Sequence, residues 1–325
     1  MQITFLGTSA GVPTRARNVS SVALRLPQRG EVWLFDCGEG TQHQLQRTPI
    51  KISQISRIFI THLHGDHLFG LMGLLATCGL AGQGQEIHLY GPDGLEEYVR
   101  MCGRISRTTL SDTLKIHTVE PGLIHREEDF GVTCQPLKHR IPSFGYRVTE
   151  SDRPGKFDVE RARALGIPSG PLYGRLKNGE RVELSDGRIV DGRELIGATL
   201  VGRSIVYCTD TIYCRSAVAL SEGADALIHE ATFAEQDEPL AVQSLHSTTA
   251  MAARVACEAG ARRLLITHIS PRYTPDGQIT PEELLAQARA VFPRTDMARD
   301  LLTFEVPRRM ESSEGDLNPV QQTSG

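Results

Sequence analysis

The strongest chemical signal in the sequence lies in residues 62–67, which hold three imidazoles and one carboxylate: His62, His64, Asp66 and His67. Three histidines at this spacing would repel one another if they were protonated. A divalent cation removes that repulsion, because it is held by neutral imidazoles and carboxylates. This mixture of nitrogen and oxygen donors is typical of zinc. The segment therefore predicts a metal site.

Six residues are too few to surround two metal ions, and three further residues share the sequence context of His62. Each follows directly on a short apolar, strand-like run: His139, Asp210 and His268. In layered α/β folds the carboxyl ends of strands gather at one edge of a sheet, where sites form. Each of these residues alone would more often be structural. Together with residues 62–67 they are candidate ligands.

The elements that must position these residues follow from the hydrophobic pattern. Short runs rich in apolar and β-branched residues predict strands over residues 3–6, 21–26, 32–36, 57–61, 87–90, 204–209, 226–229 and 264–267. Segments between several of them predict helices over residues 39–47, 68–80, 95–103, 247–259 and 281–290. The last of these begins with Thr280 as a cap and Pro281 at its first position. This mixture of elements predicts a layered α/β fold.

The composition limits the classes of protein to which the chain can belong. Its 325 residues carry 35 Lys and Arg against 39 Asp and Glu, a net charge of −4, and 40% are hydrophobic. This is a globular composition, which excludes wholesale disorder and a strongly basic coat for nucleic acid. A polyanion must therefore be bound by a local patch. Neither the N-terminus nor the apolar stretch 68–82 has the features of a targeting or membrane segment.

The seven cysteines are scattered and contain no C-x-x-C pair. This argues against a disulfide framework and against a thiolate zinc site, and it favours a reducing compartment.

Two segments differ from the rest of the chain. Residues 152–203 hold few apolar runs, many Gly and Pro residues, and ten basic against eight acidic residues. This composition predicts an insertion that leaves the core, although a surface subdomain with solvated charges remains an alternative. Residues 307–325 are polar and rich in Ser, Gln, Glu and Gly, and we expect them to be disordered.

The cluster at residues 62–67, with His139, Asp210 and His268 at these separations, resembles the metallo-β-lactamase superfamily. Further motifs are similar to one branch of it, the ribonuclease Z (tRNase Z) family: residues 5–9, 35–42, 169–176, 229–232 and 246–248. The resemblance covers residues 1–306. It implies an αββα sandwich as the catalytic domain, with residues 152–203 inserted as a protruding, flexible tRNA-binding arm. The implied activity is that of an endoribonuclease that removes 3′ trailers from precursor tRNA.

The same resemblance implies two zinc ions per subunit, with manganese or iron as alternatives. His62, His64 and His139 would hold one ion, Asp66, His67 and His268 the other, and Asp210 would bridge them. The implied reaction is attack of a metal-activated hydroxide on the phosphodiester, with Asp66 orienting or deprotonating the water. His246 would protonate the departing ribose oxygen, oriented by Glu230. The alternative for His246 is a structural role at the start of the helix that follows. His229 is interpreted as a residue that supports the ligands.

Two segments carry the expected RNA contacts. Arg15, Arg17 and Asn18 lie in a short basic loop that resembles a family loop of pattern Pro-x-Lys-x-Arg-Asn, with Arg15 in place of the Lys. Gly170, Pro171, Arg175 and Lys177 lie in the arm. For both segments the alternative is a solvated surface. The resemblance also implies a cytoplasmic homodimer that binds neither membrane nor DNA.

Three other functions remain open from the sequence. A small-molecule hydrolase of the same superfamily would lack a use for the arm and the basic loop. A di-iron redox protein would need a further carboxylate in the cluster and usually a flavin module. A non-catalytic tRNA-binding relative would lack ligands, and none is missing here.

Overall fold

The computed structural model describes residues 1–80 and 86–310. These form two compact units, one of residues 1–149 with 204–307 and one of residues 150–203 with residues 308–310. The first unit carries the candidate ligands.

Two seven-stranded sheets build the first unit. The first sheet has the order β17 (Thr303–Glu305), β1 (Gln2–Gly7), β2 (Ser21–Leu26), β3 (Glu31–Phe35), β4 (Ile55–Phe59), β5 (Ile87–Gly91) and β6 (Leu114–Thr118). The second has the order β16 (Thr295–Met297), β15 (Leu264–Thr267), β14 (Ala226–Glu230), β13 (Ser204–Cys208), β9 (Ser143–Glu150), β8 (Phe130–Leu137) and β7 (Gly122–Arg126). Strands β3 to β6 run parallel, as do β13 to β16. Parallel strands carry their carboxyl ends to the same edge, so each sheet has one edge suited to a site.

An aromatic core joins the two sheets. Phe59 of the first sheet stacks on Phe35 with ring centroids 5.1 Å apart, and lies 5.4 Å from Tyr146 of the second sheet. Trp33 and Tyr207 are buried in the same cluster. Burial of large aromatic side chains contributes much of the packing energy between layers.

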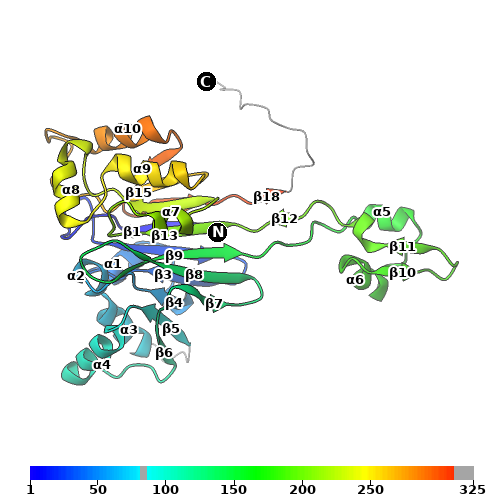
Figure 1. The fold of residues 1–325 in the computed structure, drawn as a ribbon. Helices are drawn as coiled ribbons and strands as arrows, with labels where there is room; N and C mark the ends of the chain where they lie inside the picture. Colours follow the sequence, from blue (N-terminus) through cyan, green and yellow to red (C-terminus); the bar gives the residue numbers. More distant parts are fainter. Residues whose placement is uncertain (81–85, 311–325) are drawn as a thin grey trace. The chain divides into compact units, whose positions relative to one another are not determined.

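Helices cover the outer faces of both sheets (Figure 1). The first sheet packs against α1 (Thr41–Gln46), α3 (Leu71–Leu80) and α4 (Leu95–Ser106). The second packs against α7 (Arg215–Leu220), α9 (Thr249–Glu258) and α10 (Pro281–Val291). The predicted αββα sandwich is confirmed by these four layers.

Most predicted elements form within a few residues of the expected bounds, and two differences have clear causes. The helix predicted over residues 68–80 is divided into α2 (Gly65–Leu68) and α3. Gly70 lies between them so close to the backbone that a Cβ there would be 2.0 Å from the Gly38 carbonyl oxygen. Strands β6 and β7 were not predicted, because each holds only two large apolar residues and none of these is fully buried.

The helix at Pro281 begins as predicted. The Thr280 side chain accepts a hydrogen bond from the Glu283 N–H, and the Glu283 side chain accepts one from the Thr280 N–H. This reciprocal cap satisfies two N–H groups that the helix leaves without partners.

The second unit has a hydrophobic core of its own. It contains α5 (Val159–Ala164), α6 (Pro171–Lys177) and the hairpin of β10 (Arg181–Glu183) and β11 (Ile189–Asp191). Its buried side chains are Phe157, Ala162, Ile167, Leu176, Val182, Leu184 and Leu195. The inserted segment is therefore a small folded body rather than a loop.

The expected disordered tail lies mostly outside the described residues, which end at 310. Its first residues differ from the expectation, since β18 (Arg309–Met310) pairs with β12 (Leu200–Val201). All seven cysteines are free, as predicted. Among the described residues, no helix has the length and apolar character needed to cross a membrane.

Candidate metal centre

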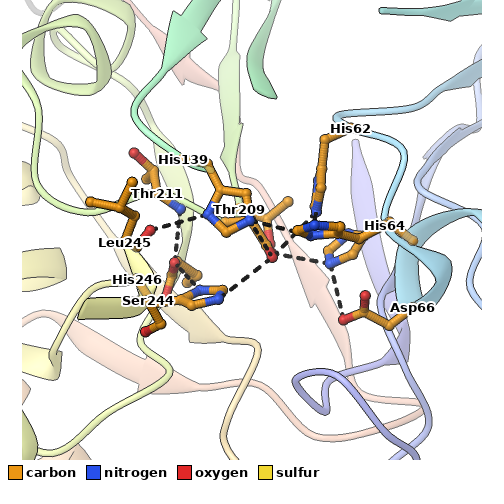
Figure 2. Close-up of polar contacts among 12 residues, drawn as sticks. His62, His64, Asp66, His139, Thr209, Thr211, Ser244, Leu245 and His246 are labelled. Atoms are coloured by element: carbon orange, nitrogen blue, oxygen red, sulfur yellow. Dashed lines mark hydrogen bonds and ion pairs between the residues drawn. The ribbon is translucent and has the colours of Figure 1, made fainter. Parts of the chain in front are cut away.

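The candidate ligands come together at the edge where the strands of both sheets end. His62 follows β4, His139 follows β8, Asp210 follows β13 and His268 follows β15. The short helix α2 adds Asp66 and His67 from its first turn. Figure 2 shows the side chains of His62, His64, His139 and His246 converging on one region. The structure thus brings together all seven residues that the sequence nominated as ligands.

The first group consists of His62, His64 and His139. His64 Nδ1 lies 3.1 Å from His62 Nε2 and 3.3 Å from His139 Nε2. One carboxylate oxygen of Asp210, Oδ2, lies 3.3 Å from His62 Nε2 and 3.7 Å from His139 Nε2. These four atoms are close enough to surround a single cation.

The second group consists of Asp66, His67 and His268. Asp66 Oδ2 lies 3.4 Å from the Nε2 atoms of both histidines, which are 3.3 Å apart. The other oxygen of Asp210, Oδ1, lies 3.1 Å from His67 Nε2 and 3.2 Å from His268 Nε2. Asp210 therefore presents one oxygen to each group, which is the placement of a bridging carboxylate.

The outer nitrogens of two histidines fix their tautomers. His67 Nδ1 lies 2.8 Å from a carboxylate oxygen of Asp36, and His139 Nδ1 lies 3.2 Å from the carbonyl oxygen of Leu245. A carbonyl or carboxylate oxygen only accepts, so in both rings Nδ1 carries the hydrogen. The Nε2 lone pair is left to face the cluster, as a metal ligand requires. The donor set and its tautomers therefore fit two divalent cations.

Asp36 is a residue of the site that sequence reasoning did not nominate. It is fully buried, and its carboxylate accepts hydrogen bonds from His67, from the N–H and hydroxyl of Thr61, and from the hydroxyl of Tyr207. It therefore anchors His67 and the segment that leads into His62. The signal was present, because Asp36 directly follows β3 just as His62 follows β4.

Three residues of the site adopt left-handed backbone conformations. The φ angles are 58° at Asp36, 42° at Asp210 and 57° at His268. Such angles are uncommon outside glycine, and they cluster at sites that the surrounding structure holds in place. Sharp turns at these strand ends aim the side chains into the cluster.

The electrostatics without a cation show which charges the site favours. Burial lowers the pKa of His139 to about 4, so its neutral form is favoured. Burial opposes ionisation of Asp210, but His268, His67 and His62 hold its pKa well below the usual range. Burial likewise opposes a charged His67, yet Asp210 and Asp36 raise its pKa well above normal. These carboxylates create a negative field that a bound cation would neutralise.

His246 and Glu230 lie beside the cluster. His246 Nδ1 is 2.8 Å from Glu230 Oε1, and His246 Nε2 is 3.9 Å from Asp210 Oδ2. Burial disfavours a charged His246, but the Glu230 carboxylate outweighs it and raises the pKa of His246 to about 9. His246 also forms a possible cation-binding group with Asp210 and His268. Because Nδ1 faces the Glu230 carboxylate, Nε2 is the ring atom that faces Asp210 and would carry the second proton of the imidazolium.

Among the described residues, His229 forms no hydrogen bond with a candidate ligand. It is buried, its Nδ1 lies 2.7 Å from the carbonyl oxygen of Glu230, and its Nε2 has no partner among the described residues. Its predicted role in supporting the ligands stays a prediction.

The basic loop lies next to the candidate metal centre, and its residues differ in how far their side chains are exposed and bonded. Gly11 N–H donates to Asp66 Oδ2 over 2.8 Å, which ties the start of the loop to the cluster. Arg17 donates to the Thr8 hydroxyl and the Ala298 carbonyl at 2.8 and 2.7 Å. Asn18 Nδ2 donates to the Glu39 carbonyl. Arg15 is exposed. Arg17 and Asn18 thus hold the loop, while Arg15 faces solvent.

In the second unit, Gly170 and Pro171 are exposed and begin α6. Arg175 Nε lies 2.8 Å from Glu180, and Lys177 lies 5.8 Å from the centre of the Phe157 ring. Several other arginines of this unit are paired in the same way: Arg163 with Glu160, Arg181 with Asp191 and Arg188 with Asp186. Exposed ion pairs of this kind contribute little stability.

Comparisons with known proteins agree with this geometry. A family model described as anti-Pycsar protein Apyc1 matches residues 1–151, and a beta-lactamase superfamily domain matches residues 180–269. The metallo-beta-lactamase fold protein YhfI from Bacillus subtilis superposes with a TM-score of 0.65 at 20% identity, over 93% of this chain and 98% of its own. The fold and the donor cluster thus define a protein of the metallo-β-lactamase fold.

Closer relatives narrow this class. The ribonuclease Z of Nostoc sp. (strain PCC 7120) is 64% identical over 96% of this chain and 97% of its own. That of Acaryochloris marina is 61% identical over 95% and 98%. The crystal structure of human tRNase Z, short form, matches with a TM-score of 0.67 and 32% identity, over 94% of this chain and 100% of its own. The chain belongs to the ribonuclease Z family, which confirms the family predicted from the motifs.

Proposed function

We propose that this chain is a zinc-dependent endoribonuclease that removes 3′ trailers from precursor tRNA. The single observation that carries the proposal is the position of Asp210 between the two donor groups. Its Oδ1 lies 3.1 Å from His67 Nε2, and its Oδ2 lies 3.3 Å from His62 Nε2. This arrangement supports a pair of cations that share one carboxylate, and such a pair can stabilise both the attacking and the leaving oxygen in hydrolysis of a phosphodiester.

Zinc is the metal that best fits the donors, although manganese and iron accept the same ligands. One ion would be held by His62, His64 and His139, and the other by Asp66, His67 and His268, with Asp210 shared. When bound, two such ions supply Lewis-acid stabilisation of the phosphate and a water of lowered pKa.

In the proposed reaction, Asp66 accepts a hydrogen bond from the attacking water. Its side chain is among the least buried of the seven candidates, and its Oδ2 faces His67 and His268. Burial opposes its ionisation, but the neighbouring His67 and His268 keep the pKa of Asp66 far below its usual value. Asp66 is therefore an acceptor at neutral pH, and it can orient a water by a hydrogen bond.

In the proposed reaction, His246 donates a proton to the departing ribose oxygen. Glu230 can only accept from Nδ1, so the second proton of the imidazolium lies on Nε2, toward the cluster. Because the pKa of His246 is about 9, this proton is present at neutral pH. General-acid help of this kind accelerates such reactions about 10²–10⁴-fold.

Two basic regions support RNA as the substrate. Arg15 is exposed on the loop that contacts Asp66 through Gly11, so it can reach a phosphate near the cleaved bond. In the second unit, Arg175 and Lys177 flank the buried Leu176, and the ion pairs around them are exposed. A phosphate can replace the carboxylate of a weak surface pair, which makes this unit a candidate grip for the tRNA backbone.

The proposal includes a cytoplasmic homodimer that acts on RNA rather than DNA. Seven free cysteines support a reducing compartment. Light scattering of the purified chain tests the dimer, because a monomer at micromolar concentration would contradict it.

The direct test is incubation with a trailer-bearing precursor tRNA, with and without a chelator, followed by mapping of the cut on a gel. We expect one cut at the 3′ end of the tRNA, loss of the cut with chelator and recovery with added zinc. The Asp210→Asn variant is the matched control and should not cleave the RNA. It removes one charged oxygen without disturbing the backbone, since asparagine also tolerates a left-handed φ. Cleavage that persists in chelator, or scattered cuts, would contradict the proposal.

A further inference from the structure

Phe69 is an aromatic side chain exposed directly beside the donor cluster. It caps the short helix α2, which supplies Asp66 and His67, and its N–H donates to the Gly65 carbonyl over 2.9 Å. Its relative exposure is 65%, whereas the large aromatic residues of the core are fully buried. A single exposed apolar residue needs no explanation by itself. Its position over the metal-binding turn is the informative feature.

The ring of Phe69 lies against the backbone of Gly65, between His64 and Asp66. A Cβ built on Gly65 would lie 2.3, 2.6 and 2.7 Å from three carbon atoms of the ring. The absence of a side chain at Gly65 therefore lets the ring lie on the turn. Phe69 is held next to two of the candidate ligands while much of it stays in solvent.

This is also the open side of the cluster. His62, His67 and His268 are buried, whereas His64 and Asp66, on either side of Gly65, are partly exposed. A phosphodiester must approach from the side where the donors are accessible. The nucleotides attached to that phosphate then pass the ring of Phe69.

We infer that Phe69 stacks on the base of one of the two nucleotides that flank the cleaved phosphodiester. The inference rests on the proposed function and adds a positioning contact for the scissile bond. Stacking on an exposed aromatic ring suits a single-stranded segment and tolerates any base, because each base has a π-face.

The test compares Phe69→Ala with wild type on three precursor tRNAs. One is intact, one lacks the base just 5′ of the cut, and one lacks the base just 3′ of it. On intact RNA we expect Phe69→Ala to lower kcat/KM about 5- to 150-fold, the usual range for removal of one base–aromatic stack. On one of the two abasic substrates, the kcat/KM of wild type should fall by the same factor. On that substrate Phe69→Ala should cause no further loss.

Phe69→Tyr keeps the ring and should stay within about two-fold of wild type, while Phe69→Leu keeps apolar volume without a π-face and should resemble Phe69→Ala. Ile105→Ala removes a comparably exposed apolar side chain from α4 and should have no effect. Bound metal and oligomeric state are measured for each variant.

Equal losses for Phe69→Ala on all three substrates overturn the inference, as do loss of metal or a change of oligomeric state that accounts for the defect. Full activity of Phe69→Ala on intact RNA also overturns it, while the proposed function stands. No cleavage of intact RNA by wild type overturns the proposed function and this inference with it.

Discussion

His246 Nδ1 lies 2.8 Å from Oε1 of Glu230, a carboxylate with no exposed surface. Glu230 also accepts hydrogen bonds from the backbone N–H groups of Thr211, Thr232 and Ser247. Such a carboxylate cannot move without losing several buried hydrogen bonds. It therefore fixes both the direction and the proton affinity of the imidazole beside the cluster.

From this pair we predict an alkaline limb in the pH profile of kcat. The folded pKa of His246 is raised from 6.5 to about 9, so the acid form is present at neutral pH and is lost as the pH rises through about 9. The contribution of the pair to stability follows the same sign: it is complete below about pH 6.5 and disappears through about pH 9. Rates measured from pH 6 to 10 check this limb.

The Glu230→Gln variant should move that limb to lower pH, because the amide no longer stabilises the imidazolium. His246→Ala should lower kcat about 10²–10⁴-fold and retain bound metal. Elemental analysis separates an acid role of His246 from a role as a metal ligand. Wild-type turnover in His246→Ala would exclude an acid role, and loss of metal would identify a ligand.

Asp210 and Asp36 allow a graded test of the metal centre. Asp210→Asn should empty both metal positions and abolish activity, because its two oxygens face different donor groups. Asp36→Asn should weaken metal binding only about 10–100-fold, since Asp36 acts through the Nδ1 of His67. Both residues have left-handed φ angles that asparagine tolerates. Metal competition with a chelator measures both losses, and an equal effect of the two variants would contradict this ranking.

The second unit can be removed together with its whole hydrophobic core. The Gly197 N–H donates to the Lys156 carbonyl over 3.0 Å, so deletion of residues 156–197 brings together chain ends that are already close. We expect kcat/KM for precursor tRNA to fall at least about ten-fold more than that for bis-p-nitrophenyl phosphate. The dependence of log affinity on log salt should also become shallower, by about 0.9 for each duplex phosphate that the protein no longer neutralises.

A smaller change controls for this deletion. The double variant Arg175→Ala, Lys177→Ala keeps the buried Leu176 between them, so the unit stays folded. It should show part of the same RNA-specific loss. Equal losses on RNA and on the small diester, in either variant, would argue against an RNA grip.

Asp300 should position the basic loop. Its Oδ1 accepts from the Thr8 hydroxyl at 2.7 Å, and its Oδ2 accepts from Asn18 N–H at 2.6 Å and from Gln44 Nε2 at 2.8 Å. In Asp300→Asn a donor replaces one of these acceptors, which should cost about 1–3 kcal/mol of stability. We expect a raised KM for precursor tRNA with normal metal content. Thermal unfolding checks the stability, with the exposed Asp276→Asn as a control that stays within about 0.5 kcal/mol.

Much of the fold could be predicted because the hydrophobic pattern is local. Runs such as residues 21–26 and 264–267 form strands with the predicted bounds, and Thr280 caps its helix as expected. The helix predicted over residues 68–80 is divided because Gly70 meets the backbone of Gly38, a contact between segments far apart in sequence. No local propensity encodes such a contact.

The sequence by itself determined the donor types, since three imidazoles and a carboxylate within residues 62–67 leave few alternatives to a metal. The family resemblance implied how the donors divide, but residue spacing did not, and only the tertiary structure shows the contacts that produce the division. It gave each oxygen of Asp210 to a different group, placed Asp36 behind His67, and turned Arg17 toward the Ala298 carbonyl rather than into solvent. These relationships join the two sheets and their connecting loops. They depend on the direction in which the chain turns at each strand end. Packing of the whole core sets that direction, and the spacing of residues along the sequence does not.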